Sequence, residues 1–404
     1  MNRHREIAIF SLLDTPAFGG AEQYLFSHLY SLSLQGYKVI LATNNQHVKK
    51  EILSRLKVDD KKIFQIINAP YRLDAIGNWK GLVKFFLTLP KAILWCIISL
   101  RQLKKKYKKV ICLWPGFSDR LVFSPIAWMN NCPLIWIEIG PLEPTFKRNL
   151  GFPKLLYRLS ERFPTHVITT SQFTKKSIIK NSHFTPKDIT LIYPGTRIFP
   201  QKEINTYRQK TKSFSTLQKI MSIGVIARLA DENEVDMVIK AFHLYLKKYS
   251  SQNIKLLIIG GGPNNQELKN LTQQLTIQNQ VIFYGFVTEE KKRIILANCD
   301  FFIFPRAWEL DGFGVTTIEA MSLGLPVLTT DFGPQIEIVT DGKEGYRYKP
   351  HDSFDLSLKI AKMVNLNTLE LKNMAKEAIN RANDFSDILS NKKMLATINS
   401  LLSL

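Results

Sequence analysis

The sequence contains little cysteine and no long uninterrupted apolar run. Its four cysteines lack the spacing of a metal site, so we interpret them as buried thiols of a reducing compartment. The opening residues MNRHREIAIFSLL lack the apolar core and cleavage site of a signal peptide. The most apolar stretch, residues 82–100, is interrupted by Lys84, Pro90 and Lys91, whereas a spanning helix needs about 18 or more apolar residues. We therefore expect a cytoplasmic protein without a transmembrane helix.

The composition is that of a globular protein with a basic front half. Hydrophobic residues make up 45% and charged residues 22% of 404 residues, which excludes disorder and suits two domains. The net charge is +21, and residues 1–200 carry 30 Lys and Arg against 12 Asp and Glu. This excess predicts an anionic partner, either a lipid surface or a phosphorylated acceptor. Nucleic acid is a weaker alternative and is not expected, because no aromatic or helix-turn-helix module accompanies the charge.

Short β-branched runs alternate with amphipathic segments along the chain. This pattern predicts an α/β fold of two doubly wound domains, facing each other across a cleft where the strands end. We predict a first domain over 1–195, a linker over the polar residues 196–218, a second domain over 219–384 and a C-terminal helix over 385–404 that packs back toward the first domain. The predicted strands are 7–13, 39–43, 63–67, 110–113, 134–138, 167–170, 190–193, 220–226, 255–259, 281–284, 301–304 and 327–329.

Several strand-to-helix loops carry candidate binding residues. Gly19 and Gly20 open a helix after the first strand, which fits a phosphate site or a plain turn. Arg228 follows a strand and has apolar neighbours in the sequence. In such a setting it either pairs with a carboxylate or binds a ligand phosphate. Phe286 and Val287 follow a later strand, at a position suited to a planar base.

The stretch ELDGFGVTTIEAMSLGLPVL, residues 309–328, combines two carboxylates with the start of a helix. Asp311 lies in the loop, and Glu319 lies on the helix, where it is placed to accept hydrogen bonds from a vicinal diol such as ribose. Singly, either carboxylate is also explained by the preference of a helix start for acidic residues. The loop amides that suit phosphate or sugar oxygens belong to Phe313, Gly314 and Val315, and Gly312 is a further candidate donor-binding residue.

These segments occur in the order found in a known family. GGAEQYL, Arg228, IIGGGP, TLIYPGT and DGFGVTTIEAMSLGLPVLTTDFGPQIEIVTDGKEGYRY resemble the retaining family 4 glycosyltransferases, which have the GT-B fold of two Rossmann-like domains. The resemblance covers almost the whole chain and is more specific in its back half. It implies transfer of a sugar from a nucleotide-diphosphate sugar to a glycan or lipid-linked acceptor, in surface polysaccharide or glycolipid biosynthesis. Retention of configuration, without a metal or other cofactor, is implied as well.

The resemblance also implies roles for individual residues. Arg228 would bind the donor diphosphate, Asp311 the transferred sugar and Glu319 the ribose, and these three are the predicted catalytic residues. The amides of residues 313–315 would hold sugar and phosphate. The loop of residues 19–20 would lie near the distal phosphate.

The sequence departs from the family at three positions. Asp311 replaces the commoner Glu, which shortens the side chain by one methylene. Asn233 occupies the donor-site position of a usual lysine, and the missing cation should weaken diphosphate binding by about 1.5–3 kcal/mol. A histidine usual after the fifth strand is missing, and Glu138 is the nearest polar candidate for acceptor contact. Asn233 keeps open the alternative of a GT-B protein that binds glycan, nucleotide or a partner transferase without turnover. An isomerase on this fold is a weaker alternative.

Residues 81–109 join an apolar face to the basic tail RQLKKKYKK. This combination predicts an interfacial helix on an anionic leaflet, and the alternative is a core helix with a solvated basic end. Pro90 predicts a break or kink within the segment. We hypothesise peripheral attachment to the inner face of the membrane through these residues.

Overall fold

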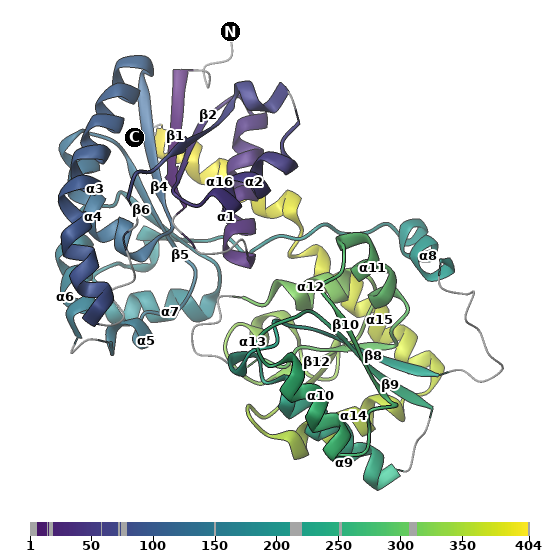
Figure 1. Ribbon diagram of the computed structural model, residues 1–404. Helices are drawn as coiled ribbons and strands as arrows, with labels where there is room; N and C mark the ends of the chain where they lie inside the picture. Colours follow the sequence, from purple (N-terminus) through teal and green to yellow (C-terminus); the bar gives the residue numbers. More distant parts are fainter. Residues whose placement is uncertain are drawn as a thin grey trace. The chain divides into compact units, whose positions relative to one another are not determined.

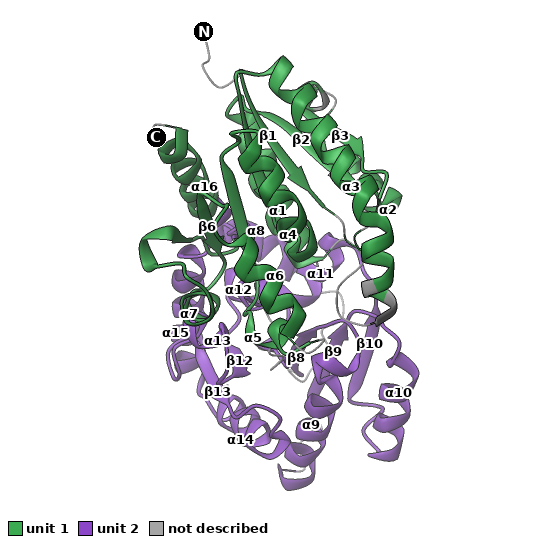
Figure 2. Ribbon diagram, turned by 90° about the vertical axis from the view of Figure 1, so that its left-hand side faces the viewer, with its two compact units in different colours: residues 1–194, 388–404 green, residues 195–387 purple. Residues whose placement is uncertain are grey.

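The computed structural model describes residues 6–13, 15, 19–57, 59–71, 73, 79–148, 151–210, 220–249, 253–306 and 313–402. The chain divides into two compact units (Figure 2): unit 1 is residues 1–194 with 388–404, and unit 2 is residues 195–387. The predicted linker 196–218 therefore belongs to unit 2. Within it, residues Gln201–Gln209 form helix α8.

Unit 1 alternates strands with helices (Figure 1). Its main elements are β1 (Ile7–Leu12), α1 (Gly20–Leu34), β2 (Lys38–Thr43), α2 (Gln46–Arg55), β3 (Phe64–Asn68), α3 (Trp79–Lys106), β4 (Lys109–Trp114), α4 (Phe117–Met129), β5 (Leu134–Glu138), α5 (Glu143–Phe146), α6 (Phe152–Ser160), β6 (His166–Thr169), α7 (Gln172–Asn181), β7 (Ile189–Leu191) and α16 (Asp387–Leu402). The strands form one parallel sheet of order β3-β2-β1-β4-β5-β6-β7.

Both faces of this sheet are covered, so its strands are apolar on both sides. Along β1, Ala8 and Phe10 enter the core beneath α3, α4 and α6, whereas Ile9 enters the core beneath α1 and α2. Helix α16 joins the second core through Met394 and Ile398. The C-terminal helix thus packs on unit 1, although the sequence places it after unit 2.

Unit 2 repeats the architecture on a six-stranded parallel sheet of order β10-β9-β8-β11-β12-β13 (Figure 1). Besides α8, its main elements are β8 (Met221–Ile226), α9 (Val235–Tyr249), β9 (Ile254–Ile259), α10 (Asn265–Gln274), β10 (Val281–Gly285), α11 (Glu289–Ala297), β11 (Phe301–Ile303), α12 (Val315–Ser322), β12 (Val327–Thr330), α13 (Gln335–Ile338), β13 (Gly345–Tyr348), α14 (Ser353–Val364) and α15 (Thr368–Asn383). The predicted strands are present, and the doubly wound α/β class is confirmed. Strand β13 was not predicted because its four residues, GYRY, include Gly and Arg and form no apolar run.

Helix α3 runs through Pro90 without the break that proline predicts. Within Val83–Lys106, the most apolar 18-residue window has a mean hydropathy of 1.7, so by length and composition alone α3 is apolar enough to cross a membrane despite its interruptions. Its inner side nevertheless belongs to the core of unit 1, where Phe85, Cys96 and Leu100 are at most 3% exposed. Length and composition alone therefore do not make α3 a transmembrane helix.

Candidate functional site

The carboxyl ends of the strands of unit 2 gather most of the predicted donor-site residues. Strands β10, β9, β8 and β11 are consecutive neighbours in the parallel sheet. Arg228 follows β8, Phe286 follows β10, and α12 begins after the loop that leaves β11. Because parallel strands end at the same edge, these groups share one edge of unit 2, where doubly wound sheets bind ligands.

Arg228 presents its guanidinium to solvent. Its side chain is 69% exposed, and the Glu232 carboxylate lies 3.5 Å from its Nη1. The apolar setting predicted from sequence neighbours is thus wrong, because the side chain points away from them. An exposed pair of this kind contributes about 0–1 kcal/mol, so little free energy opposes its exchange for a ligand phosphate.

Asn233 braces the backbone that carries Arg228. It is 8% exposed, and its Nδ2 donates a hydrogen bond of 2.9 Å to the carbonyl of Arg228. The next residue, Glu234, has a left-handed backbone with φ of 49°. The position expected to hold a cation therefore holds a buried structural amide.

The glycine run after β9 lets two loops touch backbone to backbone. A Cβ on Gly260 would lie 2.0 Å from the carbonyl oxygen of Ala227, and a Cβ on Gly262 would lie 2.2 Å from that of Leu229. The amide of Leu229 in turn donates to Gly261 at 3.1 Å. The run thereby fixes the loop that contains Arg228, since any side chain would separate the two backbones.

Phe286 extends from the end of β10 with 85% of its surface exposed. Its ring lies over Gly261, where a Cβ would come within 2.5 Å of the ring. Val287 follows and is half-buried. An exposed aromatic face at this edge offers a stacking surface for a planar ring.

The start of α12 is fixed by a buried glutamine that the sequence pattern did not indicate. Gln335 is 1% exposed, accepts hydrogen bonds from Thr317 (3.0 Å) and Thr329 (2.8 Å), and donates to the carbonyl of Phe313 at 3.1 Å. Gly314 caps the helix with φ of 81°, and a Cβ there would lie 2.0 Å from the Gln335 amide nitrogen.

The other predicted residues of this loop divide into two groups. Val315 is the first helical residue of α12, and Phe313 is 3% exposed, so its side chain packs inward while its peptide remains at the helix start. Asp311 and Gly312 lie outside the described residues. Their contacts with the sugar stay predictions.

Glu319 is paired with Lys292, which is a second residue that the sequence pattern did not indicate. The Lys292 Nζ lies 3.1 Å from Glu319 Oε2 and 3.0 Å from Glu289 Oε2. The side chains of Lys292 and Glu319 are 15% and 27% exposed. Burial lowers the pKa of Lys292, but the two carboxylates outweigh it and the net pKa is raised. A charged lysine therefore holds one oxygen of Glu319 in place.

The Gly19–Gly20 turn opens α1 in unit 1. Gly19 is the N-cap, and its amide donates to Glu22 Oε2 at 2.8 Å. A small cavity of about 100 Å³ lies at the ends of β1, β4 and β5, lined in part by Leu13, Glu22 and Gly116. The turn is thus at the ligand-binding edge of unit 1, but one of its amides is already occupied by a carboxylate.

Glu138 lies inside unit 1 rather than on its surface. It is 3% exposed, 2.7 Å from Arg120 Nη1, and accepts a hydrogen bond from the Tyr157 hydroxyl at 3.0 Å. Burial raises its pKa against the opposing effect of Arg120. Its carboxylate is therefore satisfied within the fold, and acceptor contact stays an untested prediction.

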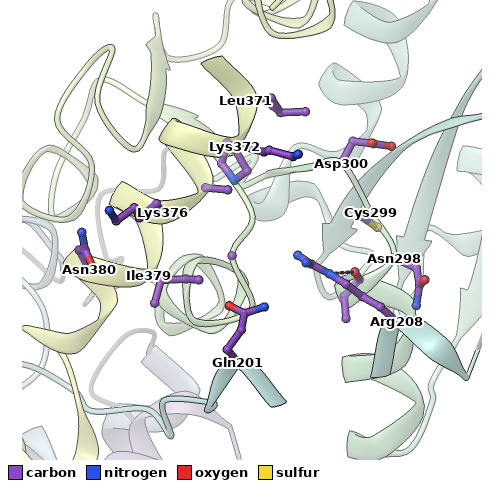
Figure 3. A pocket seen from close by; sticks show the side chains of 14 residues that line it. Gln201, Arg208, Asn298, Cys299, Asp300, Leu371, Lys372, Lys376, Ile379 and Asn380 are labelled. Atoms are coloured by element: carbon purple, nitrogen blue, oxygen red, sulfur yellow. Dashed lines mark hydrogen bonds between the residues drawn. The ribbon is translucent and has the colours of Figure 1, made fainter. Parts of the chain in front are cut away.

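A larger cavity lies at the opposite edge of the unit 2 sheet (Figure 3). It has a volume of about 620 Å³, and its lining includes Asp300 and Pro326, which immediately precede β11 and β12. Ligands of doubly wound sheets bind at the carboxyl ends of the strands, so this cavity is separate from the site of Arg228 and Glu319. Among the described residues, no group of three or more His, Cys, Asp or Glu is arranged to hold a metal ion.

Comparisons with known proteins agree with the motifs. Residues 204–382 match the family model described as glycosyl transferases group 1, so the predicted resemblance is confirmed. An uncharacterized glycosyltransferase of Methanocaldococcus jannaschii is 30% identical over 207 residues, 50% of this chain and 48% of that protein. A capsular polysaccharide biosynthesis glycosyltransferase of Staphylococcus aureus is 26% identical, over 53% of this chain and 57% of its own length. The chain thus spans about half the length of these relatives.

The fold has solved counterparts over nearly its whole length. The structure of HepE from Anabaena, in complex with UDP and glucose, superposes with a TM-score of 0.74 at 19% identity and covers 97% of this chain and 99% of that chain. The two parallel sheets with flanking helices are those of GT-B glycosyltransferases, as the sequence predicted.

Proposed function

We propose that this protein is a retaining glycosyltransferase that moves a hexosyl group from a nucleotide-diphosphate sugar to a glycan or lipid-linked acceptor. The observation that carries the proposal is the carboxyl edge of unit 2. One exposed guanidinium, one oriented carboxylate and one exposed aromatic ring lie there together, on Arg228, Glu319 and Phe286. These are the groups that recognise a diphosphate, a ribose diol and a base.

The chemistry follows from that placement. The bond between the sugar C1 and the diphosphate oxygen breaks, a bond from C1 to the acceptor oxygen forms on the same face, and the acceptor proton passes to the departing diphosphate. Arg228 and the amides at the start of α12 stabilise the charge that grows on this leaving group. Glu319 holds the ribose, and Asp311 is assigned to the sugar hydroxyls by the motif alone.

The biosynthetic role and the acceptor class are proposed from one relative's name and from the charge of the chain. A relative named for capsular polysaccharide biosynthesis supports a role in surface polysaccharide or glycolipid assembly. The basic front half suits an anionic acceptor such as a lipid phosphate. We expect activity without added metal.

The test is release of nucleoside diphosphate from a panel of nucleotide sugars, with and without membrane extract as acceptor source. Donor-dependent release that Glu319→Ala reduces, with product of unchanged anomeric configuration by NMR, is expected. Release that survives chelation of divalent metal would agree with the absence of a cofactor. Failure to bind or turn over any donor would refute the enzyme proposal.

A binding protein without turnover is the second candidate, favoured by Asn233 alone. Its amide stands where the family has a cation, so diphosphate binding is weaker by one charged contact. Donor binding measured by calorimetry, without nucleoside diphosphate release in the presence of acceptor, would select this alternative.

A further inference from the structure

Three helices of unit 1 carry apolar side chains on their outer surfaces. Helix α4 packs against both α3 and α6, and the three lie along one side of the sheet (Figure 1). These side chains are 45–75% exposed: Val83, Phe86, Leu87, Leu94 and Ile98 on α3, Trp128 and Met129 on α4, and Leu155 and Leu159 on α6. We call this surface the α3–α4–α6 face.

Contacts at both ends of α3 make this face continuous. Near its start, the rings of Phe86 on α3 and Phe152 on α6 have centroids 6.3 Å apart. Near its end, Lys104 Nζ donates to the carbonyl of Asn130 at 2.5 Å, beside exposed Trp128 and Met129. The apolar side chains of the three helices thus form a neighbourhood rather than isolated exposures, and such patches mark interaction sites.

The exposed charges on the described side chains of these three helices are all basic. Helices α3 and α6 contain no Asp or Glu, and the one acidic residue of α4, Asp119, is 3% exposed. The exposed basic residues on or beside the three helices are Lys84, Lys91, Arg101, Lys104, Lys105, Lys106, Lys147, Arg148, Lys154 and Arg162. Beyond the end of α3, exposed Glu6 is paired with Lys108, so the described border is predominantly basic. An apolar centre with such a border is complementary to an anionic, partly apolar partner.

We propose that the α3–α4–α6 face is a docking surface for an anionic lipid bilayer, on which unit 1 rests with its apolar side chains in the headgroup region. The surface extends beyond the 81–109 segment that the sequence indicates, because α4 and α6 contribute four of its apolar side chains. Trp128 suits the interface in particular, since tryptophan concentrates at the headgroup level. The lysines and arginines meet the negative surface potential of the leaflet.

Two other occupants fit the face less well. A second copy of this chain would bring one predominantly basic face against another, so like charges would oppose its association. Insertion of α3 across the bilayer would remove Phe85, Ala92, Cys96 and Leu100 from the core, where they are at most 3% exposed. Peripheral docking requires neither change.

The experiment is cosedimentation with vesicles of phosphatidylcholine alone and of phosphatidylcholine with phosphatidylglycerol in equal parts. We expect binding to the anionic vesicles that falls with added salt. The apolar variant is Leu87→Ser with Leu94→Ser and Ile98→Ser, and the basic variant is Arg101→Gln with Lys105→Gln and Lys106→Gln. Lys104 is left intact because its hydrogen bond joins α3 to the end of α4.

Each basic residue near an anionic leaflet contributes about fivefold to partitioning, so the basic variant should bind about a hundredfold more weakly. Buried leucine and isoleucine side chains contribute about tenfold each, so loss of all three should weaken binding by about a thousandfold if they are fully buried in the headgroup region, and by at least tenfold if one is. The matched controls lie on the opposite side of the sheet, on or just after α1 and α2: Leu34→Ser, 60% exposed, and Lys49→Gln with Lys50→Gln and Lys57→Gln. They should bind as the unchanged protein does.

Several results would overturn the proposal. Wild-type protein that stays in the supernatant with anionic vesicles at low salt excludes docking, and equal losses in the control variants exclude this face. A dimer in solution that the apolar variant converts to a monomer would assign the face to a second copy. Resistance of bound protein to alkaline carbonate would indicate a spanning helix. Binding is measured without donor or acceptor, so its failure is distinct from failure of the proposed transferase activity.

Discussion

Replacement of Lys292 by methionine should disturb the orientation of Glu319 while leaving Glu319 itself in place. Methionine keeps the length of the side chain but removes the ammonium that lies 3.1 Å from Glu319 and 3.0 Å from Glu289. The Glu319 carboxylate, 27% exposed in the native protein, then has the Glu289 carboxylate nearby and no ammonium between them. It is therefore free to leave the orientation that a ribose diol requires.

The loss of stability caused by Lys292→Met should lie between the values for exposed and for buried ion pairs. Exposed pairs contribute about 0–1 kcal/mol and breaking fully buried pairs costs about 3–5 kcal/mol. With side chains 15% and 27% exposed, we expect the Lys292→Met substitution to lower the free energy of unfolding by about 1–3 kcal/mol. Donor affinity should fall by roughly three- to tenfold, less than the loss caused by Glu319→Ala, which removes a charged hydrogen bond outright.

Lys291 provides the control, since it is the neighbouring lysine on α11 but is exposed. Unfolding by denaturant, together with KM for the donor and kcat from nucleoside diphosphate release, should be measured for Lys291→Met and Lys292→Met. The expected change is a higher KM for Lys292→Met, because the ribose contact is made before and during the reaction alike. Equal donor affinity in the two variants would refute the role of Lys292.

The pH dependence has a defined sign. The pKa of Lys292 is raised above its ordinary value of 10.5, because Glu319 and Glu289 outweigh the effect of burial. Its stabilising effect is thus complete below 10.5 and is lost as pH rises through the higher native pKa. The stability difference between wild type and Lys292→Met should stay constant from neutral pH to 10 or so and shrink above it.

Three further substitutions test the same edge. Arg228→Ala should leave thermal stability unchanged, since its pair is exposed, but should weaken binding of the nucleoside diphosphate by roughly 10- to 150-fold in calorimetry. Gly314→Ala should lower the free energy of unfolding by about 1–3 kcal/mol more than Gly342→Ala, because both have positive φ but only Gly314 lies against the Gln335 amide. Phe286→Ala should keep stability and weaken binding of the intact nucleotide by about 1 kcal/mol, with pyrophosphate binding unaffected.

The sequence was sufficient for the fold because its strands are buried on both faces. A continuous apolar run such as LLII, the last four residues of β9, can be recognised as a buried strand from the sequence alone. The order of glycine-rich loops then located the ligand-binding edge. Strand β13 was missed because its four residues form no apolar run, so only its pairing with β12 identifies it as a strand.

The site residues that the sequence did not predict make contacts with residues distant along the chain. Lys292 meets Glu319 across 27 residues, and Gln335 meets the Phe313 carbonyl across 22. Neither residue stands out in its local sequence, because its partner arrives only when the sheet forms. Arg228 shows the converse failure: its apolar neighbours along the chain say nothing about the side to which its own side chain points.

Substitution of Asn233 tests whether the protein transfers a sugar or only binds its ligand. The two possibilities predict different changes in kcat and KM. The leaving diphosphate gains negative charge as the bond to the sugar breaks, so a missing cation affects the transition state more than the bound donor. Asn233→Lys should therefore raise kcat more than it lowers KM, if its ammonium reaches the diphosphate.

The same substitution removes the hydrogen bond to the Arg228 carbonyl, at about 1 kcal/mol of stability. Asn233→Ala is the matched control, because it loses that bond and adds no charge. A higher kcat in Asn233→Lys with a lower kcat in Asn233→Ala would show that the cation and the brace act independently. Equal decreases in both would mean that the brace, and through it the placement of Arg228, is what this position supplies.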